Sequence, residues 1–493
     1  MRIEKILENK KNNKDIAIEH YNRSITYKEL YNESVNLSHL IKQCSNNSIN
    51  IGIIFPNSID YVVAYFGVLF AGKTIVPIQP QLTINEIISV LKYCEIDLII
   101  TNSCFKKKIE QLVSKKIYNF KVYYLDSSLY QSYEYISFIQ KSEMPKKNKY
   151  YNDIAIMLNT SGTMSNPKRV MLSHYNIISN IESNIKSLNL TKDETTLITL
   201  PMYFGYCNTA QFLTHIYLGA KIVIIDSPFL PQACFKAIEE KKVTNTTLVP
   251  TTLLSLLFFE QYDLYNYESL NFICFGGGFV PVDKLKKIIE KFPNISFCQT
   301  YGLTECSPRV TLLESKYSLS KIGSVGKPIP NVKVKIQTIV DDKLGEILVA
   351  GPNIMKGYYK NKPATLRTIK KGWLHTGDLG YLDDDGFLYL TGRIKNIIIS
   401  GGINIYPEEI EEVILNMEGI KDVVVYGIKH DFLGEVPCAK IVLLNDHITV
   451  AEIKKHCCEN LTTYKIPKQY EFVKKIEKTY SGKLKRIINE ECI

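Results

Sequence analysis

The sequence predicts an α/β fold, and two observations support this prediction. Strand-like apolar runs alternate with helical segments at short intervals, as at residues 51–55, 61–71 and 74–78. Such alternation indicates βαβ-type units with parallel pairing in the N-terminal part of the chain. The C-terminal part instead has one helical stretch, two strands and a second helix, which predicts a smaller α+β unit.

The first helical segment covers residues 25–41. It opens with Thr26 three residues before Glu29, which is the pattern of a capping box. The buried helix at 61–71 is followed by Gly72, a residue type that commonly ends helices. A strand at 154–158 then leads into the loop N-T-S-G-T-M-S-N-P-K-R at 159–169.

This loop is rich in groups that bind anions. Hydroxyls and free backbone N–H groups can wrap anionic oxygens, and Lys168 supplies positive charge. The P-loop pattern G-x-x-x-x-G-K-[ST] is not matched, and a polar turn is the alternative for such a cluster taken alone. The candidate binding residues of the loop, together with Lys168, are Thr160, Ser161, Gly162 and Thr163.

An aromatic, uncharged segment at 199–208 follows a helix at 174–188. Aromatic walls around a small residue suit an apolar ligand, and core packing is the alternative. The pocket candidates are Tyr203, Phe204, Gly205 and Tyr206.

Two later segments combine glycine with polar side chains. A strand at 270–275 runs into Gly276, Gly277 and Gly278, where a flat ligand can lie against backbone without a Cβ in the way, although a tight turn uses the same residues. The amphipathic helix that follows places Leu285 and Ile288 on one face.

The second segment is Y-G-L-T-E at 301–305. Here the ring of Tyr301 can stack, the hydroxyl of Thr304 can meet phosphate, and the carboxylate of Glu305 can hold Mg²⁺. Further on, W-L-H-T-G-D at 373–378 places Asp378 in a glycine-flanked turn, where carboxylates commonly bind a ribose diol.

Composition narrows the class of protein. The chain has 493 residues, 45% of them apolar and 22% charged, which is ordinary for a globular protein. No apolar run reaches the roughly 20 residues that a membrane span needs, and the charged N-terminus has no signal core, so we expect a cytoplasmic protein. Twelve cysteines without a C-x-x-C pair argue against zinc. The net charge of +10 comes without a basic stripe, so we expect no nucleic-acid partner.

Taken together, the motifs resemble those of the adenylate-forming superfamily, which includes acyl-CoA synthetases, peptide-synthetase adenylation domains and luciferases. The match extends from I-T-Y-K-E-L at 25–30 to G-K-L-K-R at 482–486, with the motifs in the family's order. The resemblance implies a large N-terminal AMP-binding domain at 1–393, a hinge at 394–396 and a small mobile C-terminal domain at 397–493. The form S-G-G-I-N-I-Y-P at 400–407 is most similar to acyl-CoA synthetases.

The resemblance also implies roles on the nucleotide. In that family the loop at 159–169 holds the β- and γ-phosphates of ATP, and the three glycines with Tyr301 frame the adenine. Thr304 and Glu305 are catalytic residues that serve the α-phosphate and Mg²⁺. Asp378 and Arg393 reach the ribose.

Two lysines complete the set that the resemblance implies. Lys395 corresponds to the hinge about which the C-terminal domain swings. Lys483 corresponds to the catalytic lysine that touches the substrate carboxylate and the α-phosphate as the acid attacks phosphorus. If it stabilises charge that develops only in the transition state, its loss decreases the rate by about 10²–10³.

The phosphate loop departs from the family pattern T-S-G-[TS]-[TS]-G-x-P-K-G at three positions. Met164 replaces a hydroxyl residue and forfeits one phosphate donor. Ser165 replaces a glycine and lacks its ease at positive φ. Arg169 replaces the last glycine and adds a cation, whose position relative to the phosphates the sequence leaves open.

The resemblance implies a two-step reaction that uses ATP, Mg²⁺ and CoA. Amino-acid-activating members pair an aspartate with the substrate ammonium, but residues 203–207 contain no acidic residue. We therefore expect a small-molecule carboxylic acid without an α-amino group, with a fatty or other apolar chain favoured and an aryl acid as the alternative. The acceptor is CoA or the phosphopantetheine of an acyl carrier protein. A non-catalytic nucleotide or acyl binder is the alternative from another class.

Overall fold

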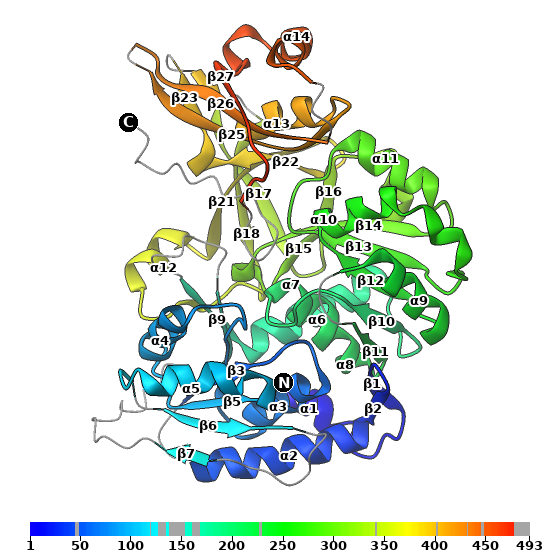
Figure 1. Cartoon of the computed structure of the whole chain (residues 1–493), viewed down its shortest axis with the longest axis vertical. Coiled ribbons are helices and arrows are strands. Elements are labelled where there is room, and N and C mark those ends of the chain that lie inside the picture. The colour runs from blue at the N-terminus through cyan, green and yellow to red at the C-terminus, as the bar shows by residue number, and fades with distance from the viewer. Residues whose placement is uncertain are drawn as a thin grey trace.

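The protein is described by a computed structural model, which covers residues 1–44, 49–118, 120–126, 135–137, 153–159, 168–225, 229–340, 343–400, 403–430, 432–444 and 448–477. A large N-terminal domain of sheets and helices is followed by a small C-terminal domain, which lies at the top of Figure 1. The predicted α/β fold is confirmed. Within the described ranges, no helix is long and apolar enough to cross a membrane.

An eight-stranded sheet forms the lower part of the large domain in Figure 1, with the order β19-β9-β8-β4-β3-β5-β6-β7 in the described residues. Its central strands pair in parallel, as the alternation of strand and helix predicts, and only β7, β9 and β19 at its two ends pair antiparallel. The strands are β3 (Asn50–Ile54), β4 (Thr74–Pro77), β5 (Leu98–Thr101), β6 (Lys121–Tyr124), β7 (Tyr135–Ser137), β8 (Ile154–Asn159), β9 (Arg169–Ser173) and β19 (Gly357–Tyr358).

The helices of this part follow from local sequence signals. The predicted capping box is present, because the Thr26 N–H donates to the Glu29 carboxylate at 2.9 Å and the Glu29 N–H donates to Thr26 Oγ1 at 3.2 Å. The mostly apolar helix α3 is buried and ends just before Gly72, whose φ is +71°. The helices are α1 (Glu4–Glu8), α2 (Tyr27–Cys44), α3 (Ile59–Phe70), α4 (Ile84–Tyr93) and α5 (Lys106–Ser114), with the 3₁₀ turn η1 (Ser103–Phe105).

In the described part of the chain, fourteen strands form a second sheet that runs through the rest of the large domain. Its path is β17-β18-β21-β22-β16-β15-β14-β13-β12-β10-β11-β1-β2, with β20 paired to β21. The strands from β11 to β14 pair in parallel, and those from β14 to β17 pair antiparallel. This one sheet therefore carries both the glycine-rich strand ends and the strands that hold Asp378 and Arg393.

The strands of this sheet are β1 (Ile16–His20), β2 (Arg23–Thr26), β10 (Thr195–Ile198), β11 (Lys221–Ile224), β12 (Asn245–Leu248), β13 (Phe272–Gly276), β14 (Ser296–Gly302), β15 (Arg309–Leu313), β16 (Ser324–Pro328), β17 (Lys333–Val340), β18 (Leu344–Ala350), β20 (Ile369–Lys370), β21 (Trp373–Leu382) and β22 (Leu388–Arg393). The helices are α6 (His174–Leu188), α7 (Gly205–Cys207), α8 (Thr214–Leu218), α9 (Pro231–Lys241), α10 (Pro250–Ser255), α11 (Val282–Lys291) and α12 (Lys362–Thr368). A π-helical turn η3 (Asn208–Leu213) joins α7 to α8, and the 3₁₀ turns are η4 (Leu256–Phe258), η5 (Glu260–Leu264), η6 (Thr304–Cys306), η7 (Ser315–Tyr317) and η8 (Ile394–Asn396).

The C-terminal domain has its own five-stranded sheet and its own core. Helix α13 packs Ile410 and Ile414 against Val423 and Val425 of the sheet, as its apolar spacing predicts. The elements are β23 (Ile398–Ser400), β24 (Ile403–Ile405), α13 (Pro407–Leu415), β25 (Ile420–His430), β26 (Gly434–Leu443), α14 (Val450–Asn460), η9 (Thr463–Lys465) and β27 (Gln469–Phe472).

Candidate active site

Three of the residues that are predicted to bind the nucleotide lie together on the large sheet. Asp378 and Arg393 are direct register partners on β21 and β22, and Arg393 Nε lies 2.7 Å from Asp378 Oδ1. The Tyr301 hydroxyl donates to Asp378 Oδ2 at 2.7 Å from the end of β14. The carboxylate of Asp378 raises the pKa of Arg393, and burial raises the pKa of Tyr301. Each Asp378 oxygen keeps a second lone pair, so the carboxylate can still accept from a ligand hydroxyl.

The local structure around Asp378 differs from the predicted turn, because Asp378 lies within strand β21, next to an irregularity of the ladder. The preceding Gly377 has φ +70°, which favours glycine. Glu346 of β18 holds this segment, since one of its oxygens accepts from the Gly377 N–H at 3.0 Å and the other lies 2.7 Å from His375 Nδ1. Thr376 Oγ1 accepts from the Asp378 N–H at 3.0 Å. Sequence reasoning noted Glu346 only as part of a strand entry, without a role.

Glu305 and Lys168 meet at the ring of Tyr358. The Tyr358 hydroxyl donates to Glu305 Oε1 at 2.8 Å, and Lys168 Nζ lies 4.8 Å from the centre of the Tyr358 ring. Thr304 and Glu305 are both half-buried in the short 3₁₀ turn after β14. Sequence reasoning noted Tyr358 only as part of a glycine–tyrosine run, without a role.

This geometry fits Mg²⁺ supplied with a nucleotide. No group of three or more potential metal ligands among His, Cys, Asp and Glu exists in the described part of the chain. Mg²⁺ in nucleotide sites needs only one or two carboxylates, because phosphate oxygens and waters fill the other positions. Glu305, a half-buried carboxylate beside Lys168, is therefore a suitable single protein ligand.

The three glycines have different local environments. A Cβ on Gly276 would lie 2.4 Å from the Thr300 carbonyl oxygen, so strand packing itself requires glycine there. Gly277 has φ +87°, and Gly277 and Gly278 are both exposed at the strand end. The exposed backbone of these two residues is the part that remains open to a flat ligand.

The side chains of the aromatic segment make contacts in two different parts of the domain. The Tyr203 hydroxyl donates to Gln81 Oε1 at 3.1 Å, and its ring packs at 4.8 Å from that of Phe204. Tyr206 Oη instead lies 2.7 Å from Thr300 Oγ1 on β14, close to the site. A Cβ on Gly205 would make a tight contact with the Leu158 side chain, at 3.3 Å, and an ordinary one with Thr304, at 3.8 Å. Gly205 and Tyr206 thus lie beside β14 and the turn at Thr304, whereas Tyr203 faces the loop after β4.

The sequence alone does not say where the charge of Arg169 lies relative to the phosphates, but the structure defines its position. Val170 packs in the core cluster that contains Tyr358, so by strand alternation Arg169 points to the other face of β9. Its side chain is 1% exposed, lies near Cys94, and has a pKa lowered by burial. The charge of Arg169 therefore lies on the face opposite to the one where Lys168 contacts Tyr358.

Several predicted site residues take no part in the contacts described above. Lys395 is exposed in η8, immediately after the strand that carries Arg393. The residues outside the described ranges are Thr160, Ser161, Gly162, Thr163, Met164, Ser165 and Lys483.

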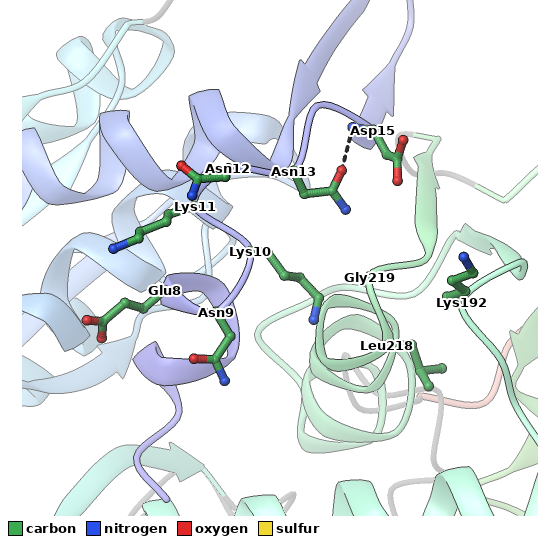
Figure 2. Close-up of a pocket in the computed structure, with 10 residues that line it drawn as sticks. All are labelled: Glu8, Asn9, Lys10, Lys11, Asn12, Asn13, Asp15, Lys192, Leu218 and Gly219. Carbon is green, nitrogen blue, oxygen red and sulfur yellow. Dashed lines mark hydrogen bonds between the residues drawn. The ribbon is translucent and has the colours of Figure 1, made fainter.

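A separate surface hollow of about 410 Å³ lies between the segment after α1 and the end of α8 (Figure 2). Lys10 donates from Nζ to the Tyr217 carbonyl oxygen at 2.8 Å, and the Asp15 N–H donates to Asn13 Oδ1 at 2.7 Å. In Figure 1, α1 and α8 lie well below β21, the strand that carries Asp378, and no predicted site residue lines the hollow. It is therefore not part of the candidate active site.

Comparison with known proteins identifies two family domains in the chain. Residues 7–359 match the AMP-binding enzyme family, and residues 409–483 match the AMP-binding enzyme C-terminal domain. A long-chain-fatty-acid–CoA ligase of Bacillus subtilis (strain 168) is 31% identical, over 96% of this chain and 91% of that protein. A 2-succinylbenzoate–CoA ligase of Bacillus cereus is also 31% identical, over 95% and 94%. The structure of O-succinylbenzoate coenzyme A synthetase from Bacillus subtilis in complex with ATP and magnesium ion is 29% identical, with a TM-score of 0.85 over 97% of each chain.

Proposed function

Because the chain belongs to the AMP-binding enzyme family, we propose that it is an AMP-forming ligase that joins an apolar carboxylic acid, of the fatty or aryl class, to the thiol of CoA. The observation that most supports this proposal is the convergence of Asp378, Arg393 and Tyr301 on one side and Glu305 with Lys168 on the other. Asp378 is a hydrogen-bond acceptor suited to the hydroxyls of a ribose. It therefore lies near a carboxylate suited to Mg²⁺ and a cation suited to phosphate.

In the first step, a carboxylate oxygen of the acid attacks the α-phosphorus of Mg·ATP. The bond to the bridging oxygen of pyrophosphate breaks, and an acyl-adenylate forms. Such a step depends on positioning and on stabilising the charge of the phosphorane-like transition state. Asp378 and Arg393 orient the ribose, Lys168 and the loop at 160–167 bind the β- and γ-phosphates, and Glu305 holds Mg²⁺.

Thr304 and Lys483 act on the α-phosphate in this proposal. Thr304 donates a hydrogen bond to an α-phosphate oxygen from the turn η6 that follows β14. Lys483 arrives from the C-terminal domain and neutralises charge on the attacking carboxylate and the phosphorus. The proposed domain bounds are 1–393 and 397–493, with residues 394–396 as the hinge at Lys395.

In the second step, the CoA thiol attacks the acyl carbonyl, its proton leaves, and AMP departs with the bonding electron pair. The C-terminal domain turns about the hinge between the two steps. The short turn η8 supports this role, because it is the connection between the last strand of the large sheet and the first strand of the small one. The uncharged aromatic segment with Gly205 and Tyr206 supports an apolar acid body.

The test is pyrophosphate release from Mg·ATP with a panel of fatty, aryl and amino acids. We expect release with apolar acids and none with amino acids. Thioester analysis with CoA in parallel with a holo acyl carrier protein then identifies the acceptor. Thioester formation only on the carrier protein would contradict CoA as the acceptor, and no acid-dependent pyrophosphate release would contradict the ligase proposal itself.

A further inference from the structure

The surface hollow between the segment after α1 and the end of α8 has the lining of a polar binding site (Figure 2). Its volume of about 410 Å³ is within the range of small-molecule sites. Among the described residues that line it, none is aromatic, and Leu218 has the one apolar side chain. A nucleobase or an acyl chain would therefore have little to pack against, whereas a hydrophilic ligand would meet lysine and asparagine side chains.

The hollow carries an excess of positive charge. Three of its lining residues are lysines, and within the described ranges Lys10, Lys11 and Lys192 form no ion pair. Two lining residues are acidic. Glu8 pairs at 2.6 Å with Lys5, which does not line the hollow, so its charge is already balanced. Asp15 alone is left to offset the three lysines.

Lys10 is the lysine that the protein encloses most closely. Its Nζ donates to the Tyr217 carbonyl oxygen in the last turn of α8 at 2.8 Å, and its Cε would lie 3.0 Å from a Cβ on Gly219. Burial lowers the pKa of Lys10. An ammonium group has three N–H donors and the carbonyl takes one, so two remain for a ligand. Because its burial is not offset by an acidic partner, this cation would be stabilised by a bound anion.

Helix capping by Lys10 does not account for the other two lysines. Lys11 follows α1 and Lys192 follows α6, and in the described part of the chain neither side chain donates a hydrogen bond to a backbone carbonyl. The C-terminal ends of α1 and α8 each offset at most about half a positive charge. Even together with Asp15, these two ends do not balance three lysines.

We propose that this hollow is a binding site for a small anion of the phosphate class, held chiefly by Lys10 and Lys192. A phosphate group has two negative charges near neutral pH and several acceptor oxygens, which suit ammonium groups that approach from two segments of the chain. Asn13 adds a donor, because its Oδ1 accepts from the Asp15 N–H at 2.7 Å and its NH₂ group is left for the ligand. This inference is independent of the proposed ligase function.

The experiment is a calorimetric titration of the full chain with inorganic phosphate at constant ionic strength, without ATP or acid. The variants are Lys10→Met and Lys192→Met. Lys14→Met is the matched control, because Lys14 is an exposed lysine of the same segment that does not line the hollow. A parallel titration with glycerol 3-phosphate distinguishes an organic phosphate ester from the free ion.

We expect the wild-type chain to bind phosphate with a Kd of about 1 mM or below. Each hollow variant should weaken binding about tenfold or more, since a hydrogen bond to a charged group is lost, and Lys14→Met should leave the Kd unchanged. Lys192→Met carries the test if Lys10→Met does not fold without its cap on α8. Tighter binding of glycerol 3-phosphate assigns the hollow to an ester, and tighter binding of phosphate assigns it to the free ion.

Three results overturn the proposal. They are no binding by the wild-type chain at about 10 mM phosphate, equal weakening in Lys14→Met and the hollow variants, and an unchanged Kd in the hollow variants. The last result would place the phosphate elsewhere on the protein. None of the three bears on the ligase proposal, because the titration contains neither ATP nor an acid.

Discussion

Two arginines at the two sides of the candidate site differ in how their charge is balanced. Arg393 has a side chain that is 36% exposed, and it pairs with Asp378 at 2.7 Å. Arg309 is buried at 1% exposure, and its partners are an amide and a phenol. The charge of Arg393 is neutralised by a carboxylate of the protein, in the proposed ribose site. Within the described ranges, no carboxylate forms an ion pair with Arg309.

The largest effect is expected for Lys483→Ala, which tests whether the common chemistry is independent of the acid. Removal of a charge that acts in the transition state costs about 3–4 kcal/mol, or about 10²–10³ in the rate of adenylation. Single-turnover formation of acyl-adenylate measures this step with each acid. We expect the same factor with a fatty acid and with an aryl acid, and a factor that depends on the acid would contradict a role of Lys483 at the phosphorus.

Asp378→Asn is expected to weaken ATP binding for every acid alike. The variant loses the charge that holds Arg393 and accepts from Tyr301, and hydrogen bonds to charged groups contribute about 1.5–3 kcal/mol each. KM for ATP should therefore rise about tenfold to a hundredfold. The exposed Asp385, which pairs with Lys321 on the surface, provides the matched control Asp385→Asn, for which we expect no change. An unchanged KM for ATP in Asp378→Asn contradicts the ribose role.

His174 is a buried histidine whose neutral form is favoured by burial. Burial lowers the pKa of His174 to about 3, and its Nδ1 accepts from the Ile3 N–H at 3.1 Å, with Glu4, Arg2 and the N-terminus nearby. In the unfolded chain the pKa is about 6.5, so between pH 6.5 and 3 only the unfolded chain binds the proton.

The free energy of unfolding should therefore fall as the pH decreases from about 6.5, by about 2 kcal/mol at pH 5 from this residue. Urea unfolding at pH 7 and pH 5 measures the loss. His174→Gln should lose less stability over the same interval. An equal loss in the variant removes His174 as the cause.

Glu346→Gln is expected to have the smallest effect. The carboxylate holds the Gly377 N–H and His375, so the neutral amide weakens the segment that carries Asp378 without touching the ligand. Loss of such a contact costs about 1 kcal/mol, which corresponds to about a fivefold increase in KM for ATP with little change in kcat. Glu314→Gln, which breaks only a surface ion pair with Lys316, should leave both constants unchanged. A larger effect on kcat than on KM would assign Glu346 a different role.

The parts of the fold that sequence predicts are those set by local rules. The capping box at Thr26, the helix end at Gly72 and the apolar face with Ile410 and Ile414 all depend on neighbours within a few residues, and all three are confirmed. Pairing between distant strands does not depend on such neighbours. The register of Asp378 with Arg393 and the placement of Asp378 on a strand followed only from the folded sheet.

For the candidate site, too, local sequence patterns predict individual residues but not their contacts. Tyr301 and Asp378 were predicted separately, by motif and resemblance, but no local pattern indicated that one donates to the other. The contacts of Glu346 and Arg309 were missed for a related reason. They arise from burial and from partners on other elements, and a glutamate or arginine in a strand sequence is more often exposed.

The most direct test of the ligase assignment is a product analysis of one reaction mixture with Mg·ATP, CoA and an apolar acid. Chromatography resolves AMP, ADP and the acyl-CoA thioester, and the acid is omitted in the control. We expect AMP and acyl-CoA in a one-to-one ratio and neither product without the acid. ADP as the nucleotide product, or AMP that forms equally without the acid, would contradict the account.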